Sequence, residues 1–280
     1  MDTLCPAIIQ EFLTFLPARP WLDSETYPTS TDVYTAQDVA PAEDRPIYCH
    51  PDLTLILRLM EFLVGLVRSL DIGSVSCQSM QECLEAMSDV SFQAEVDMSR
   101  YSSHVTSAIR PIIQAIAEAT GLPGRFSVEQ QAVSEVQGDF DVTVVRKWLE
   151  DGRVLWEPVV VCSEEDRAYS VLLEKAEELS RPFSLDATEK QTGAKAMAVK
   201  LALQMVAAKA EYGFFFAGYI AIAAQLVRSP DPSRPGRILL LSPVFKLQNE
   251  TLPYPNSLTH FQAKIPTEPF LAILVAMLLR

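Results

Sequence analysis

The stretch that most constrains the fold runs from Gly138 to Glu165 and contains two long runs of strand-forming residues. An Asp-Gly pair, Asp151 and Gly152, separates them. Asp-Gly between alternating apolar runs is the strongest short-range signal for a two-residue hairpin loop. The stretch therefore predicts a β-hairpin, with the apolar run from Val154 to Cys162 as its second strand.

This two-residue loop also fixes which residues lie opposite each other. Counting back from the loop, Asp141 lies opposite Cys162 and Asp139 lies opposite Glu164. Side chains alternate between the two faces of a strand, so we expect these four side chains to share one face at one end of the hairpin. A slip of one residue would move one strand's set to the other face.

The charge balance bears on possible partners. The chain has 280 residues and a formal net charge of −13, with its Lys and Arg residues scattered. That length suits one large domain or a domain with an added lobe. Nucleic-acid binders usually carry a basic patch that neutralises phosphates. The net charge therefore disfavours nucleic acid as a partner.

Cysteine usage and the N-terminal residues predict an intracellular location, cytoplasmic or nuclear. Five cysteines without regular spacing are typical of free thiols in a reducing compartment. The three histidines are far apart and no CxxC motif occurs, so we expect no zinc site. The first residues lack a basic segment before an apolar run, so we expect no secretory leader.

Composition predicts three segments. Residues 1–50 carry a short amphipathic helix at 7–16, and their proline-rich remainder indicates a flexible N-terminal arm. Residues 51–102 form a helical extension. Its first helix, 52–70, is strongly apolar, but its charged residues are too costly for a membrane span, so we expect no membrane association. We expect that helix to bind a protein partner or a second copy. Residues 103–280 form an α/β domain.

The α/β domain follows from the order of its periodic segments. We expect, in chain order, a helix at 103–120, a strand at 125–133, the hairpin, helices at 166–180 and 192–211, a strand or strand pair at 214–227, a strand at 237–241 and a closing helix at 268–279.

This α–β–β–β–α–β order, with acids at the start of the hairpin, resembles the PD-(D/E)XK (restriction-endonuclease-like) superfamily over roughly residues 103–242. The resemblance implies an α/β fold with a restriction-endonuclease-like αβββαβ core and a mixed central sheet, here with a helical N-terminal extension. In that family an acid opens the second core strand, and the paired strand carries Glu-x-Lys or Asp-x-Lys. The carboxylates hold Mg²⁺, and the lysine positions and activates the attacking water.

The motif can be carried over residue by residue. Asp141, with Asp139, matches the first acid; Cys162 stands in place of the second carboxylate, and Glu164 in place of the lysine. Gln204 lies in the helix that often adds a glutamine. The resemblance thus implies Asp141, Asp139 and Glu164 as metal ligands, and the same residues with Gln204 as the catalytic set. Mg²⁺ would be the cofactor only of an active enzyme.

The chain departs from the family where the chemistry is most demanding. Cys-Ser-Glu replaces Glu-x-Lys, yet cysteine is not a preferred Mg²⁺ ligand and an extra acid supplies no positive charge for the transition state. Lys147 shares the face of Asp141, but six strand residues place it about 20 Å away. Lys195 and Lys200 are alternative donors. Glu118 could match an additional acid that some members carry.

Each candidate also has a purely structural explanation. Asp139 and Asp141 could cap a strand and satisfy a turn. Glu164 precedes a helix, where acids complement the helix dipole. Cys162 fits a small buried apolar position, and Gln204 could hydrogen-bond a neighbour.

Three hypotheses follow. The chain is a nuclease-fold protein that has lost catalytic residues and acts as a binding or scaffold module, or it is a divergent Mg²⁺-dependent phosphodiesterase acting on DNA or RNA. The third is an α/β protein unrelated to nucleases, favoured if the predicted strands do not form one mixed sheet. The sequence contains no GxSxG, P-loop, GxGxxG or HExxH motif that would indicate another enzyme class. Enzyme and non-enzyme hypotheses both stay open.

Overall fold

The computed structural model describes a large part of the chain, and all described strands belong to one sheet. The described residues are 46–69, 113–114, 117–118, 121–131, 141–164, 172, 175–185, 193–217, 220–233, 235–247, 266–268 and 270–280. The expected helix at 7–16 and most of the helix at 103–120 lie outside these residues. At some positions within strands and helices, including residues 141 and 164, the structure describes the backbone alone.

The sheet has ten strands and mixes parallel and antiparallel pairs. Its main path runs β2-β3-β4-β6-β7-β8-β1-β5, with β9 beside β7 and β10 beside β9. The pairs β4/β6, β8/β1 and β9/β10 are parallel and the others antiparallel. The strands are β1 (Ile47–Pro51), β2 (Arg125–Gln131), β3 (Asp141–Glu150), β4 (Arg153–Glu164), β5 (Phe183–Ser184), β6 (Tyr212–Ala217), β7 (Ile220–Arg228), β8 (Arg237–Leu241), β9 (Phe245–Leu247) and β10 (Thr267–Glu268).

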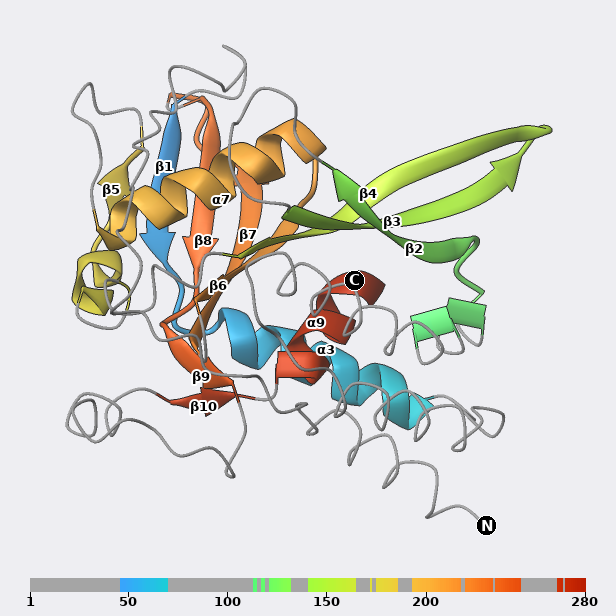
Figure 1. The fold of residues 1–280 in the computed structure, drawn as a ribbon, viewed down its shortest axis with the longest axis horizontal. Helices are drawn as coiled ribbons and strands as arrows, with labels where there is room; N and C mark the ends of the chain where they lie inside the picture. The colour runs from blue at the N-terminus through green and yellow to red at the C-terminus, as the bar shows by residue number, and fades with distance from the viewer. Residues whose placement is uncertain are drawn as a thin grey trace, which may run out of the picture.

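Helices cover both faces of this sheet (Figure 1). Helix α7 (Ala194–Ala208) and the short helix η4 (Ala176–Ser180) pack on one face, while α3 (Leu55–Ser69) and α9 (Phe270–Leu279) pack on the other. Alternation along β6 shows the two faces directly, since Phe214 and Phe216 contact the α3–α9 layer and Phe215 contacts the α7 layer. The molecule is therefore a three-layer α/β/α structure.

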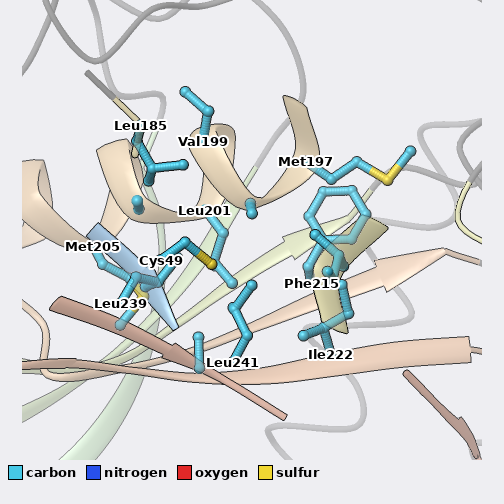
Figure 2. Close-up of a cluster of buried hydrophobic side chains, with 14 of the residues drawn as sticks. Cys49, Leu185, Met197, Val199, Leu201, Met205, Phe215, Ile222, Leu239 and Leu241 are labelled. Carbon is cyan, nitrogen blue, oxygen red and sulfur yellow. The ribbon is translucent and has the colours of Figure 1, made fainter. Parts of the chain in front are cut away.

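The two cores follow from the composition of their helices. Helix α9 is apolar around its whole circumference, which is typical of a buried helix, and all its residues from Ala272 to Leu278 are buried. Helix α7 lies very close to β6: a Cβ added at Gly213 would lie 2.7 Å from Met205 Sδ. Figure 2 shows the core beneath α7. Its labelled side chains are Cys49, Leu185, Met197, Val199, Leu201, Met205, Phe215, Ile222, Leu239 and Leu241.

Helix α3 begins at Leu55, three residues after the predicted start at residue 52, and Asp52 forms the turn that precedes it. Asp52 Oδ1 accepts hydrogen bonds from Thr54 N at 2.9 Å and from Thr54 Oγ1 at 2.8 Å, and Oδ2 accepts one from Arg58 Nη2 at 2.7 Å. Partial burial raises the pKa of the Asp52 carboxyl, but these hydrogen bonds and the Arg58 charge outweigh it and hold the pKa below its usual value. None of the helices in the described part of the chain is long and apolar enough to cross a membrane.

Several expected elements are confirmed. The apolar stretch 214–227 is a strand pair, β6 and β7, and the closing helix is α9. Residues 47 to 50 differ from expectation, because they belong to β1 rather than to a flexible arm. Ile47 and Cys49 are fully buried there, since β1 pairs with β8 and the alternate side chains enter the core under α7.

The hairpin forms with the predicted loop, and its register is confirmed only near that loop. Asp151 and Gly152 both have positive φ, 48° and 74°, as a type I′ turn requires. Pairing follows the prediction from Glu150 opposite Arg153 to Val145 opposite Pro158. A β-bulge then adds one residue on β4, so every later pair is shifted by one.

Candidate functional site

The predicted metal ligands lie at the end of the hairpin that the bulge shifts. Asp141 is the first residue of β3 and Glu164 the last of β4, and Asp139 lies outside the described residues. The pairing predicted for Asp141 is wrong by one residue, because Val142 lies opposite Cys162. Continuing this register places Ser163 opposite Asp141. The physical reason is the bulge beside Pro158, which the hairpin loop alone could not predict.

Cys162 takes the structural role that its residue type allows. Its side chain is 5% exposed and packs with Val160 and Phe214 in the core beneath α3 and α9. Its neighbour Val161 packs in the other core, beneath α7. Cys162 therefore lies on the opposite face of the sheet from the helix that carries Gln204.

Gln204 is buried in α7, with 1% of its surface exposed. Lys200 precedes it by one helical turn and is 7% exposed. The helix thus holds two polar side chains one turn apart within a largely apolar layer, where buried polar groups require hydrogen-bond partners. The structure brings together Gln204 and Lys200, a pair that the sequence named separately.

The other lysines considered as donors have defined surroundings. The ammonium of Lys195 lies 5.2 Å from the centre of the Phe183 ring, a cation–π contact between α7 and β5. Lys147 lies opposite Trp156 in the hairpin. Both lysines therefore lie beside aromatic residues, Lys195 beside Phe183 and Lys147 opposite Trp156.

Glu118 acts as a local hydrogen-bond acceptor. It is exposed, and its Oε1 accepts a hydrogen bond of 2.9 Å from Gln114 Nε2. The same Gln114 Nε2 contacts the carbonyl oxygen of Gly124 at 3.3 Å, just before β2. Gln114 therefore links the helical residues around Glu118 to the start of strand β2, which pairs with the hairpin. Within the described ranges, no three His, Cys, Asp or Glu side chains gather closely enough to hold a metal ion.

A buried tyrosine is part of a polar cluster that sequence reasoning missed. Gln225 Nε2 donates to Glu211 Oε1 at 2.7 Å and to the Tyr212 hydroxyl at 3.1 Å. Burial and then the Glu211 charge raise the pKa of Tyr212 to about 12, so its phenol is neutral at physiological pH. The sequence signal was only a Tyr-Gly pair after a helix, which indicates a break and no partner.

The Cys49 thiol is not poised for nucleophilic chemistry. Burial raises the pKa of Cys49 to about 12, although the Lys195 charge acts in the opposite direction. The thiolate is the reactive form of cysteine. Cys49 is therefore a buried apolar side chain in the core under α7.

The hairpin also carries an exposed surface that the apolar run did not predict. We call residues 146–157 the hairpin arm; it extends past the rest of the sheet (Figure 1). Large apolar side chains on it are exposed: Leu149 by 70%, Val154 by 68%, Trp156 by 56% and Leu155 by 36%. Glu157, a charged residue within the apolar run, was the available signal for solvent near this end of the hairpin.

Comparisons with known proteins give no relative. No protein-family model, curated protein or solved structure matches the chain.

Proposed function

We propose that this protein is a binding or scaffold module built on a restriction-endonuclease-like core whose metal-dependent nuclease site has degenerated. The observation that carries the proposal is the register at the end of the hairpin, which leaves no carboxylate–lysine pair opposite Asp141. The nuclease chemistry needs a second carboxylate for Mg²⁺ and a cation near the attacked phosphate.

The order of elements supports the core. Three antiparallel strands, β2, β3 and β4, are followed by helix α7, and the chain then returns through β6, parallel to β4. These strands form one mixed sheet together with β7. Strands that failed to form one mixed sheet would have favoured an α/β protein unrelated to nucleases.

The residues at the motif positions support the loss of catalysis. The position opposite Asp141 is Ser163 in the continued register, and Glu165 stands two residues further along the sequence. A serine hydroxyl is a weaker Mg²⁺ ligand than a carboxylate, and a glutamate cannot supply the lysine's charge. The motif is therefore incomplete in the predicted register and in the observed one.

Calorimetry tests the proposal directly. Mg²⁺ and Mn²⁺ are titrated into wild type, Asp141→Ala and Glu150→Gln, the last being a control that removes an exposed acid from the same hairpin. We expect the three proteins to give the same weak heats, because an acidic surface binds divalent cations without using Asp141 specifically.

Cleavage of single- and double-stranded DNA and RNA, with either metal, completes the test. We expect wild type to show no activity above Asp141→Ala. Binding of one metal ion that only Asp141→Ala abolishes, together with cleavage lost in that variant alone, would replace this proposal with the divergent phosphodiesterase.

A further inference from the structure

The hairpin arm is a two-stranded ribbon with open edges. Strand β2 pairs with β3 only as far as Arg125 opposite Lys147, and β6 pairs with β4 only from Val160 onward. In the part of the chain that the structure describes, β3 is the only strand that pairs with β4 between Arg153 and Val159. An isolated two-stranded ribbon is marginally stable in water, so a projecting one is a natural place for an intermolecular contact.

Three of the four large exposed apolar residues of the arm lie on one face together with Lys147, and Leu155 lies on the other face. Leu149 lies opposite Val154, and Trp156 follows two residues after Val154, so the three side chains project from the same side. More than half of each side chain is exposed. Interface cores are enriched in aromatic residues, and Trp is among the commonest residues that dominate binding energy.

The charges of the arm are balanced within the arm itself. Arg146 forms an ion pair with Glu157, and its guanidinium lies 5.3 Å from the centre of the Trp148 ring. Glu150 lies opposite Arg153, and its Oε2 accepts a hydrogen bond from Trp148 Nε1 at 3.4 Å. Three basic and three acidic residues give the arm a formal charge of zero, and Lys147 among them lies opposite Trp156 rather than opposite an acid.

This neutrality selects the occupant. A nucleic acid would need surplus cations, and a basic protein would need surplus anions, but the arm offers neither. Two copies of a chain with a net charge of −13 repel each other over most of their surfaces, and least through an apolar patch that lies beside Lys147.

We propose that the protein forms a two-fold dimer in which the arms of two copies pack face to face through Leu149, Val154 and Trp156. A two-fold contact uses the same patch on both copies, so a self-complementary apolar face suits it. Edge-to-edge pairing of the two β4 strands is limited by Pro158, which has no backbone N–H to donate. This inference stands apart from the proposed function, because it uses neither the nuclease-like core nor the predicted metal ligands.

Sedimentation velocity of the full chain tests the dimer. Wild type is compared with Trp156→Thr, which keeps strand preference, and with Leu57→Gln on α3, a matched control because Leu57 is also 56% exposed. We expect a concentration-dependent monomer–dimer equilibrium in wild type and Leu57→Gln, weakened at least about tenfold in Trp156→Thr. Circular dichroism confirms that each variant is folded.

The dependence of dimer formation on salt concentration provides a second test. Association of two acidic molecules through their apolar faces should strengthen when salt screens the repulsion between the molecules, whereas a contact held by opposite charges should weaken. A wild type that stays monomeric up to about 100 μM overturns the proposal. So does a dimer that Leu57→Gln disrupts and Trp156→Thr does not, since that result would place the interface on α3.

Discussion

The two halves of strand β4 have the same kind of sequence and opposite surroundings. From Val160 onward, β4 lies between β3 and β6 with helices on both faces, and Val160 and Val161 are essentially inaccessible to water. Before Pro158 the strand has only β3 beside it, and Val154 and Trp156 are mostly exposed.

This contrast separates two uses of apolar side chains. In the body of the sheet they stabilise the fold, because water is excluded from both faces. In the hairpin arm they contribute little to folding and are free to form an intermolecular contact. Residue type alone does not distinguish the two uses; the number of neighbouring strands and helices does.

The largest expected difference in stability lies between a truncation in the body of the sheet, Phe214→Ala, and one in the hairpin arm, Leu149→Ala. Phe214 is fully buried and stacks on Phe216 with ring centres 5.5 Å apart. We expect Phe214→Ala to lower the free energy of unfolding by about 3–5 kcal/mol. Leu149→Ala in the arm should change it by less than about 0.5 kcal/mol. Urea denaturation measures both, and similar costs at the two positions would contradict the contrast.

Two glycines give a second comparison, because alanine should lower the stability of the protein at one of them and raise it at the other. A Cβ at Gly124, which has a φ of 104°, would lie 2.5 Å from the backbone oxygen of Lys147 at the base of the arm. We expect Gly124→Ala to cost about 2 kcal/mol. A Cβ at Gly65 in α3 meets nothing within 4 Å, so Gly65→Ala should stabilise by about 0.5–1 kcal/mol. Thermal unfolding of both variants checks the two signs.

Asp52 tests the helix layer through pH. Its folded pKa is lowered, so its carboxylate adds stability above the unfolded pKa of about 4, and this stability is lost as pH falls through the folded pKa. We expect Asp52→Ala to cost about 1 kcal/mol at pH 7 and progressively less below about pH 4.

Asp52→Asn is the control, because asparagine keeps the hydrogen bonds to Thr54 and loses the charge beside Arg58. Its cost should be smaller than that of the alanine variant. Denaturation curves at several pH values would contradict the assignment if the cost of Asp52→Ala stayed constant through the acidic range.

The smallest effect is expected in the arm. Glu157 pairs with Arg146, and the side chain of Glu157 is 44% exposed. Solvent screens such a pair, so Glu157→Gln should change the free energy of unfolding by less than about 1 kcal/mol. Denaturation at low and high salt measures it. A larger cost would show that the arm contributes to folding as the body does.

The sequence predicted local features well and surroundings poorly. The Asp-Gly loop, the strand pair within 214–227 and the helix that follows the Asp52 turn each depend on a few adjacent residues. Strand β1 was missed because its short polar context shows no periodicity, and its burial depends on pairing with the distant β8. Contacts between distant segments leave little trace in a local pattern.

The candidate site shows the same limit. A two-residue loop predicts the register only while both strands advance together, and one extra residue on β4 placed Val142 rather than Asp141 opposite Cys162. Pro158 was visible in the sequence, and a proline within a strand is typical of an edge or a bulge. The hydrogen bonds of Tyr212 with Gln225 required the completed sheet.

The parallel pairing of β1 with β8 has a consequence for how the protein is made. Arg237 pairs with Ile47 but follows it by about 190 residues. At roughly 5–20 residues per second, the first strand leaves the ribosome roughly 10–40 s before its partner exists. During that interval Ile47 and Cys49, which are fully buried in the finished protein, lack the strand β8 that pairs with them. This side of the sheet can therefore be completed only after about 190 further residues have been made.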